Sequence, residues 1–345
     1  MGFTMEQKPK DRDLIETNEG LIFCVVGYLH PNDRYTAYLK YVPASEGKWT
    51  RGEAAYSRVV PYYHVTQVEN TYSFLRDKYP KYLYNCPVRN IIVSSVPRED
   101  VLRYYHPKER LDSILREGAS DPLEEKLVSL VELFKDKTGI STSNLGVTGS
   151  ILTKTHNPSF SDIDLTLHDI SATNIIRKAI RAIRRVNSEL EPYNDKQISE
   201  WCSDRTKRFP LSFEDLMLIA RRRWNYSYYK KTYVSFHPIR LDGEIDETYG
   251  DFIYFPKGSV FGTAIISSSN ESVFLPSIYK VEETDIELDL DIKQLVSYEG
   301  MFSDIFRAGE RVEFSGILEK VSGRDNFYQV LIGGSGSKDS YIKLA

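Results

Sequence analysis

The sequence predicts an α+β protein with strands toward both ends of the chain and helices gathered in its middle. Residues 20–42 alternate apolar and polar positions and are rich in Val, Tyr and Phe, which is typical of antiparallel strands. Apolar residues recur at helical spacing over 122–137. After residue 243, short alternating runs are separated by Gly, Pro, Asn and Asp. We therefore expect an N-terminal, mostly antiparallel α+β module over 1–105, a core over 106–241 and an acidic β-rich C-terminal domain over 242–345.

Composition favours a cytoplasmic globular protein. The 345 residues suffice for two or three domains, and 41% of them are hydrophobic. No apolar run approaches the length of a membrane span, and the N-terminus has no apolar region of a secretory signal. The three cysteines are scattered without metal-ligand spacing, which predicts reduced, buried thiols. The 24 tyrosines and the 27% of charged residues favour a thermophilic source.

The N-terminal module is expected to begin with a frayed polar segment over 1–18. A β-hairpin follows, with strands Leu21–Leu29 and Arg34–Tyr41 across a turn at Pro31–Asp33. Further elements are listed in chain order: a strand over 57–67, a helix over 69–78 and a strand over 90–96.

The core is expected to hold most of the helices. Pro97 begins a helical stretch that is interrupted at His106-Pro107. Ser171 and Ser212 are typical N-caps. The expected helices span 107–117, 122–137, about 171–190 and about 212–224, and the expected strands span 145–148 and 232–239.

The C-terminal domain is expected to be a small barrel with strands over 251–255, 259–267, 273–280, 311–321 and 327–332. Its charge differs from that of the rest of the chain. Residues 242–345 carry 9 basic and 19 acidic residues, whereas 171–231 carry 14 basic and 7 acidic residues. The basic segment suits a polyanionic substrate, and the acidic C-terminal part does not suit nucleic acid.

The strongest functional signal is a Gly149-Ser150 pair followed by Asp162-Ile-Asp164-Leu. On a strand, Asp162 and Asp164 point the same way while the apolar residues between and after them face the core. Two adjacent carboxylates repel, and a hard divalent cation, Mg²⁺ or Mn²⁺, relieves the repulsion. A Gly-Ser turn exposes N–H groups and a hydroxyl that can hold phosphate oxygens. The pattern predicts metal-dependent nucleotide chemistry; the alternative is a polar strand edge beside an ordinary turn.

This pattern resembles the signature of the DNA polymerase beta-like nucleotidyltransferase superfamily, over roughly 120–240. The resemblance implies a nucleotidyltransferase core, a short mixed sheet with helices, between the two flanking parts. It also implies transfer of a nucleoside monophosphate from an NTP to an acceptor hydroxyl, most readily of RNA, with release of pyrophosphate. Asp162 and Asp164 would hold the metal, and Gly149, Ser150 and Lys154 the phosphates.

A third carboxylate, which members of this superfamily place on a later strand, is missing from its expected position. Archaeal CCA-adding relatives carry it in a Val-Asp-x-x-Pro run, and Val234-Ser-Phe-His-Pro238 is the closest match here. Ser235 then stands where the acid belongs. His237 shares its face and can serve as ligand or base, the loop acids Asp242, Glu244 and Asp246 can reach back, or no third group exists.

Two basic stretches are candidates for nucleic-acid contact. Arg181 and Arg185 lie on one face of the helix after the Asp pair, and Arg222 and Trp224 belong to an Arg- and Tyr-rich run. Each stretch also suits a solvated face or the carboxyl end of a helix. Two other functions stay open, a catalytically silent nucleotide- or RNA-binding protein and a transferase that acts on a protein acceptor. The oligomeric state is not predicted.

Overall fold

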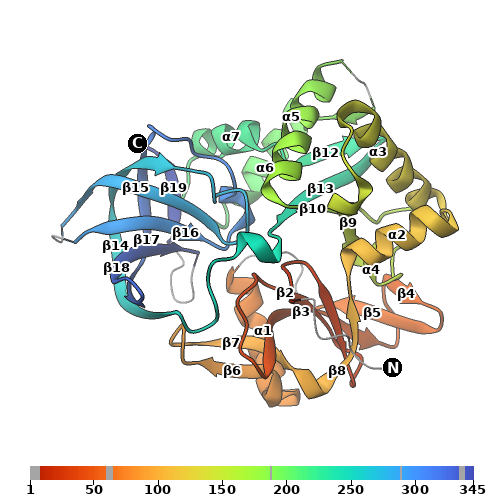
Figure 1. The fold of residues 1–345 in the computed structure, drawn as a ribbon, viewed down its shortest axis with the longest axis horizontal. Coiled ribbons are helices and arrows are strands. Elements are labelled where there is room, and N and C mark those ends of the chain that lie inside the picture. The colour runs from red at the N-terminus through yellow and green to blue at the C-terminus, as the bar shows by residue number, and fades with distance from the viewer. Residues whose placement is uncertain (1–7, 60–64, 187–188, 288–289, 334–338) are drawn as a thin grey trace.

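The computed structural model describes residues 8–59, 65–186, 189–287, 290–333 and 339–345 (Figure 1). Its described elements form an α+β fold, as expected. The strands make three sheets that follow one another along the chain: an N-terminal sheet, a central sheet and a C-terminal sheet. The helices are α1 (Val65–Lys78), α2 (Pro107–Glu117), α3 (Pro122–Thr138), α4 (Gly149–Leu152), α5 (Ile170–Val186), α6 (Asp195–Arg205) and α7 (Phe213–Arg222).

The N-terminal sheet has the order β4-β5-β3-β2-β1-β8, with β7 paired to β3 and β6, and its pairings are antiparallel. The predicted hairpin is confirmed by β2 and β3, and the predicted helix by α1. The strands are β1 (Leu14–Thr17), β2 (Ile22–Val25), β3 (Arg34–Ala44), β4 (Trp49–Arg51), β5 (Ala54–Arg58), β6 (Leu83–Cys86), β7 (Ile91–Pro97) and β8 (Val101–Tyr105).

Three predictions for this part of the chain are wrong. The segment expected to fray contains β1, which is buried between β2 and β8. The strand expected over 57–67 ends at Arg58, and α1 begins at Val65; residues 60–64 lie outside the described residues. The helix expected from Pro97 is instead β8, because Val101–Tyr105 are β-branched and aromatic residues that pair antiparallel with β1.

The central sheet has the order β11-β12-β13-β10-β9. β10 runs parallel to β13 and antiparallel to β9, so the sheet is mixed. The helices expected over 107–117 and 122–137 are confirmed by α2 and α3. Helix α5 begins before Ser171 because the carboxylate of Asp169 accepts a hydrogen bond from the Ala172 N–H. The strands are β9 (Leu145–Thr148), β10 (Ile163–His168), β11 (Leu190–Glu191), β12 (Tyr226–Tyr229) and β13 (Thr232–Ile239).

The C-terminal sheet closes into a barrel. Its order is β14-β15-β16-β18-β17-β19, and an additional pairing of β14 with β17 completes a ring of five strands among the described residues. Only β16 and β18 in this ring are parallel neighbours. The predicted barrel is therefore present. The strands are β14 (Phe252–Ser268), β15 (Ser277–Ile286), β16 (Ile292–Ser297), β17 (Arg311–Gly323), β18 (Phe327–Ile332) and β19 (Tyr341–Leu344).

The hydrophobic cores cross the division expected at residue 241. Trp201 of α6 and Leu216 of α7 belong to one buried cluster with Phe302 and Phe314 of the barrel. Conversely, Phe274 of the C-terminal part packs into the core of the central sheet. Helices α6 and α7 thus join the central sheet to the barrel through continuous apolar packing.

Candidate active site on the central sheet

One row of side chains crosses the central sheet and lines a cavity of about 1030 Å³ between the three sheets. The register of the strands pairs Thr148 with Asp164, Asp164 with Ser235, and Ser235 with Tyr226. Directly paired residues point to the same face of a sheet. The neighbouring positions on that face, Asp162 and His237, also line the cavity.

Gly149 permits the close approach of the Gly-Ser turn to Asp164. Its φ is +69°, in the region that L side chains rarely adopt. A Cβ atom at this position would lie 2.3 Å from Oδ2 of Asp164. Glycine is therefore required both by the backbone conformation and by the carboxylate that lies against it.

Asp164 is held by β13. The Ser235 hydroxyl donates a hydrogen bond to Oδ1 of Asp164, and Nε2 of His237 lies 2.7 Å from the Ser235 hydroxyl and 3.7 Å from Asp164 Oδ1. Burial alone would raise the pKa of Asp164, but His237, Lys40 and Ser235 outweigh it and hold this pKa well below its usual range. Burial and the charge of Arg12 lower the pKa of His237, which keeps its imidazole neutral at pH 7.

Asp162 has the opposite electrostatic environment. Burial and the neighbouring charge of Asp164 raise its pKa to about 6, and the charge of Arg58 only partly offsets them. Among the described residues, its carboxylate receives no hydrogen bond. Two carboxylates of one motif are thus pushed apart in pKa, which is a frequent property of functional sites.

The N-terminal sheet supplies cations to this site, which the sequence analysis missed. Lys40 of β3 is only 7% exposed, and its charge acts on Asp164 and His237. Arg58 of β5 acts on Asp162, and Arg12 on His237. The backbone carbonyl of Arg12 accepts a hydrogen bond of 2.7 Å from Thr148. No local motif marks these residues, because they come from a different sheet.

The predicted phosphate-binding residues lie beside the cavity rather than on its described lining. Ser150 is 8% exposed, and its carbonyl accepts the Thr155 N–H at 2.9 Å. Lys154 is exposed, and its charge acts on Glu117 at the end of α2. The resemblance still assigns them to phosphate, but neither reaches the cavity wall in this conformation.

Among the candidates for the third group, His237 comes closest to Asp164. Asp242 forms an ion pair with Lys10 at 2.5 Å and does not line the cavity. Glu244 accepts hydrogen bonds from the N–H groups of Ile170 and Leu241. Glu244 and Asp246 line the cavity. In the described residues, neither of them joins the Asp pair in a group close enough to share a metal ion.

The candidates for nucleic-acid contact divide between surface and core. Arg181 and Arg185 are exposed on α5. Both guanidinium nitrogens Nη1 and Nη2 of Arg222 bind Glu310, at 2.7 and 2.9 Å, and tie α7 to the barrel. Trp224 is 2% exposed in the core, where its ring stacks near Phe236, so a nucleobase cannot stack on it.

A second acidic group lies behind the Gly-Ser turn. Asp121, Glu124 and His156 bring their ligand atoms within 4.8 Å of one another. These atoms already have partners: Nε2 of His156 lies 2.6 Å from Asp121, and Glu124 binds Arg110 and Ser120. Arg110 in turn donates to the carbonyl of Ile151 in α4 at 3.1 Å. Through Arg110, the group therefore stabilises the conformation of the Gly-Ser turn.

The fold and the site together define a class of protein: three packed sheets around a cavity that is lined by paired aspartates and by cations from another part of the chain, with a glycine turn packed beside it. No helix of the described residues is long and apolar enough to cross a membrane. No model of a known protein family matches the chain, and no solved structure matches it.

The chain is 30% identical to an uncharacterized protein of Methanocaldococcus jannaschii, MJ1086, over 345 residues, which cover 98% of this chain and 99% of the relative. The chain therefore belongs to the same family as that protein. The match covers the residues of all three sheets.

Proposed function

We propose that the chain is a metal-dependent nucleotidyltransferase that moves a nucleoside monophosphate from an NTP to an acceptor hydroxyl. The observation that carries the proposal is the packing of Gly149 against Asp164, beside Asp162, on the wall of a large cavity. Lys40 and Arg58 add positive charge at the same place, which suits a triphosphate.

The residues present fit a divalent cation. A Cβ on Gly149 would fill the space beside Asp164, and the carboxylate of Asp162 receives no hydrogen bond from a described residue. The raised pKa of Asp162 means that Arg58 compensates its charge only in part, and a cation would supply the rest. Asp162 and Asp164 would hold Mg²⁺ or Mn²⁺, which would neutralise phosphate charge during transfer.

The transfer joins the acceptor oxygen to the α-phosphorus and breaks the bond from that phosphorus to pyrophosphate, which leaves with the bonding electrons. His237 is the group suited to accept the hydroxyl proton, because its lowered pKa keeps it neutral at pH 7. Ser235 lies between His237 and Asp164 and holds both in position.

The second candidate function is nucleotide binding without transfer. Ser235 favours it, because a hydroxyl replaces the third carboxylate opposite Asp164 and a second metal would lack that ligand. Retention of two repelling aspartates favours the enzyme. RNA and protein acceptors remain proposals for the transfer reaction, and the exposed Arg181 and Arg185 are the residues that suit RNA.

The test is incubation of the full chain with each α-labelled NTP and Mg²⁺ or Mn²⁺, followed by measurement of released pyrophosphate and of metal-dependent NTP binding. Asp162→Asn/Asp164→Asn should abolish both. Asp136→Asn, which removes an exposed carboxylate from α3, should change neither. Metal-dependent binding that survives the double substitution would refute the site, and binding without transfer in the unaltered chain would select the second candidate.

A further inference from the structure

A row of hydrogen-bonded polar side chains crosses the outer face of the barrel. The register pairs Lys280 with Gln294, Gln294 with Gln329, and Gln329 with Glu319. The Lys280 ammonium donates to Gln294 Oε1 at 2.5 Å, Gln294 Nε2 donates to Gln329 Oε1 at 2.7 Å, and Gln329 Nε2 donates to Glu319 at 2.6 Å. We refer to these four residues as the amide row.

The amide row forms part of the cavity wall that the aspartates also line. Gln294, Gln329 and Glu319 are 8%, 1% and 3% exposed. Each amide nitrogen carries a second N–H, and Glu319 keeps one carboxylate oxygen without a hydrogen bond from a described residue. The row therefore offers donors and an acceptor in a fixed orientation. Burial raises the pKa of Glu319, and the hydrogen bond from Gln329 and the charge of Arg89 offset this rise only in part.

The charge of the cavity wall differs between the two parts of the chain that form it, a basic lining before residue 240 and an acidic lining from residue 240 onward. Of the described lining residues before residue 240, seven are Lys or Arg and three are Asp. Of those from residue 240 onward, two are Lys or Arg and seven are Asp or Glu. The two basic residues of the acidic lining, Arg240 and Lys280, already contact Glu271 and Gln294, and Arg89 of the basic lining reaches it at Tyr298. A triphosphate suits the basic lining better than the acidic lining.

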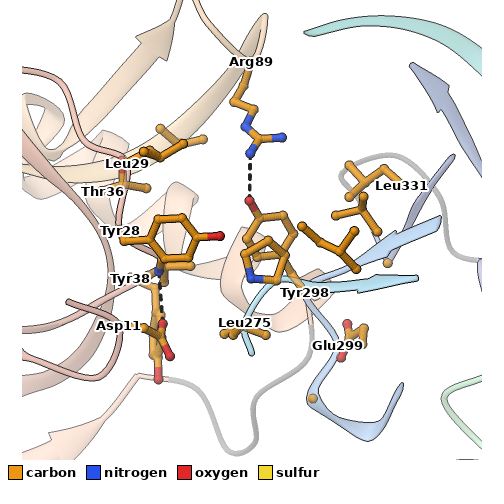
Figure 2. A pocket seen from close by; sticks show the side chains of 18 of the residues that line it. Asp11, Tyr28, Leu29, Thr36, Tyr38, Arg89, Leu275, Tyr298, Glu299 and Leu331 are labelled. Atoms are coloured by element: carbon orange, nitrogen blue, oxygen red, sulfur yellow. Dashed lines mark hydrogen bonds between the residues drawn. The ribbon is translucent and has the colours of Figure 1, made fainter. Parts of the chain in front are cut away.

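The acidic lining also presents aromatic and apolar surface. Figure 2 shows Tyr298 and Leu275 of the C-terminal part opposite Tyr28 of the N-terminal part. Arg89 donates a hydrogen bond of 3.0 Å to the Tyr298 hydroxyl (Figure 2) and stacks 3.9 Å from the centre of the Tyr254 ring. Arg240 is 8% exposed, and its Nε has no hydrogen-bond partner among the described residues. This donor, buried on the cavity wall, is a second indication of a polar ligand.

We propose that the amide row and the aromatic surface beside it form a binding subsite for a small, uncharged or cationic molecule rich in hydroxyl or amino groups. Such a molecule is the acceptor of the transfer, and this assignment of its role rests on the proposed function. The cavity volume of 1030 Å³ lies at the upper end of the roughly 300–1,000 Å³ of ligand pockets, which accommodates an NTP and a second molecule together.

The strand order of the barrel supports the location. Five-stranded Greek-key barrels of the oligonucleotide/oligosaccharide-binding type use the face of their second and third strands for ligands, and β15 and β16 are those strands here. This is a comparison of topology alone. The carboxylates of Glu319 and Glu299, 3% and 5% exposed, favour a sugar-like ligand over an oligonucleotide on this face.

The test measures binding of three probes to the full chain without NTP or metal, by saturation-transfer NMR and calorimetry. The probes are cellobiose, the disaccharide of glucosamine, and decauridylate. We expect both disaccharides to bind. Glu319→Gln should weaken the glucosamine disaccharide by at least about tenfold, the size of one hydrogen bond to a charged group, and cellobiose by less than about threefold.

Two further variants make the result specific. Glu282→Gln removes the same charge from an exposed position of the barrel and should change nothing. Lys280→Met removes a cation from the row and should raise the preference for glucosamine disaccharide over cellobiose, opposite in sign to Glu319→Gln. Glu319→Gln keeps a side-chain oxygen that can accept the hydrogen bond from Gln329. Melting curves verify that each variant folds.

The subsite is refuted if neither disaccharide binds at millimolar concentration, if only decauridylate binds, or if Glu319→Gln and Glu282→Gln behave alike. These outcomes are independent of the transferase proposal, because NTP and metal are absent. If the chain binds the disaccharides but never transfers a nucleotide, the subsite is supported and its role as the acceptor site is refuted.

Discussion

Replacing each aspartate of the pair by asparagine should change the stability of the metal-free protein in opposite directions. Burial and Asp164 raise the pKa of Asp162 from 3.8 to about 6. A raised pKa means that the folded state is favoured while the group is protonated and that this stability is lost as pH rises from about 4 to above 6. Asparagine does not titrate, so Asp162→Asn should match the original chain at pH 4 and exceed it at pH 8.

The magnitude is small for this position. The shift corresponds to about 3 kcal/mol for a fully buried group. The Asp162 carboxylate is crowded by protein atoms at the cavity wall, but the residue as a whole is exposed to solvent, and screening by this solvent reduces the expected gain to about 1 kcal/mol. For 345 residues with an unfolding entropy of about 2.1 cal/mol/K each, that gain is an increase of roughly 1–2 °C in Tm.

Asp164→Asn should destabilise at pH 8. Its pKa is held below the usual range, so its contribution is present above about pH 4 and is lost as pH falls further. The variant loses a charged partner of the Ser235 hydroxyl, which costs about 1.5–3 kcal/mol, or roughly 2–4 °C.

Scanning calorimetry in EDTA at pH 4, 6 and 8 measures both effects, with Asp136→Asn as the control that should show neither. Excess Mg²⁺ at pH 8 should then raise the Tm of the original chain toward that of Asp162→Asn. Equal shifts of the same sign for the two variants, or a gain for Asp162→Asn that is already complete at pH 4, would contradict the assigned electrostatics.

Four further predictions concern the central sheet and the turn beside it. Gly149→Ala should lower Tm and abolish metal-dependent NTP binding, because its Cβ would lie 2.3 Å from Asp164 Oδ2; a variant with unchanged Tm would show that the turn can move. Ser150→Ala should weaken NTP binding, measured by calorimetry, by about 1–3 kcal/mol, and unchanged affinity would place the phosphates elsewhere. His237→Gln should abolish transfer while sparing NTP binding, and full activity of this variant would exclude His237 as the base. Ser235→Asp should increase transfer if the missing third carboxylate limits the rate. Single-turnover rates test both variants.

The sequence predicted those helices and strands whose conformation is determined by their own residues. Strand β13 was expected over 232–239, as it is, and its register pairs Ser235 with Asp164, which was one of the arrangements left open. Helix α7 was expected from the Ser212 cap, whose hydroxyl accepts the Asp215 N–H. Helix α6 was missed, although the capping box of Asn194 and Gln197 is visible in the sequence.

The rest of the site depends on contacts between distant segments. Lys40 lies more than a hundred residues before Asp164, on a strand whose sequence shows only that it is a strand. The segment after Pro97 has a helix-start pattern, but pairing with β1 decides its conformation. The acidic C-terminal part was visible as composition, and only the packed structure places seven of its carboxylates on the wall of a cavity.

The apolar packing of α6 and α7 against the barrel determines where this chain can be divided. A fragment that ends at residue 241 would expose Leu216 and Trp201 to water, and a fragment that begins at 242 would leave Phe302 and Phe314 uncovered. Expression of either half would yield aggregating protein. The barrel and residues 193–222 therefore form one packing unit, and a chimaera that exchanges the barrel should carry both.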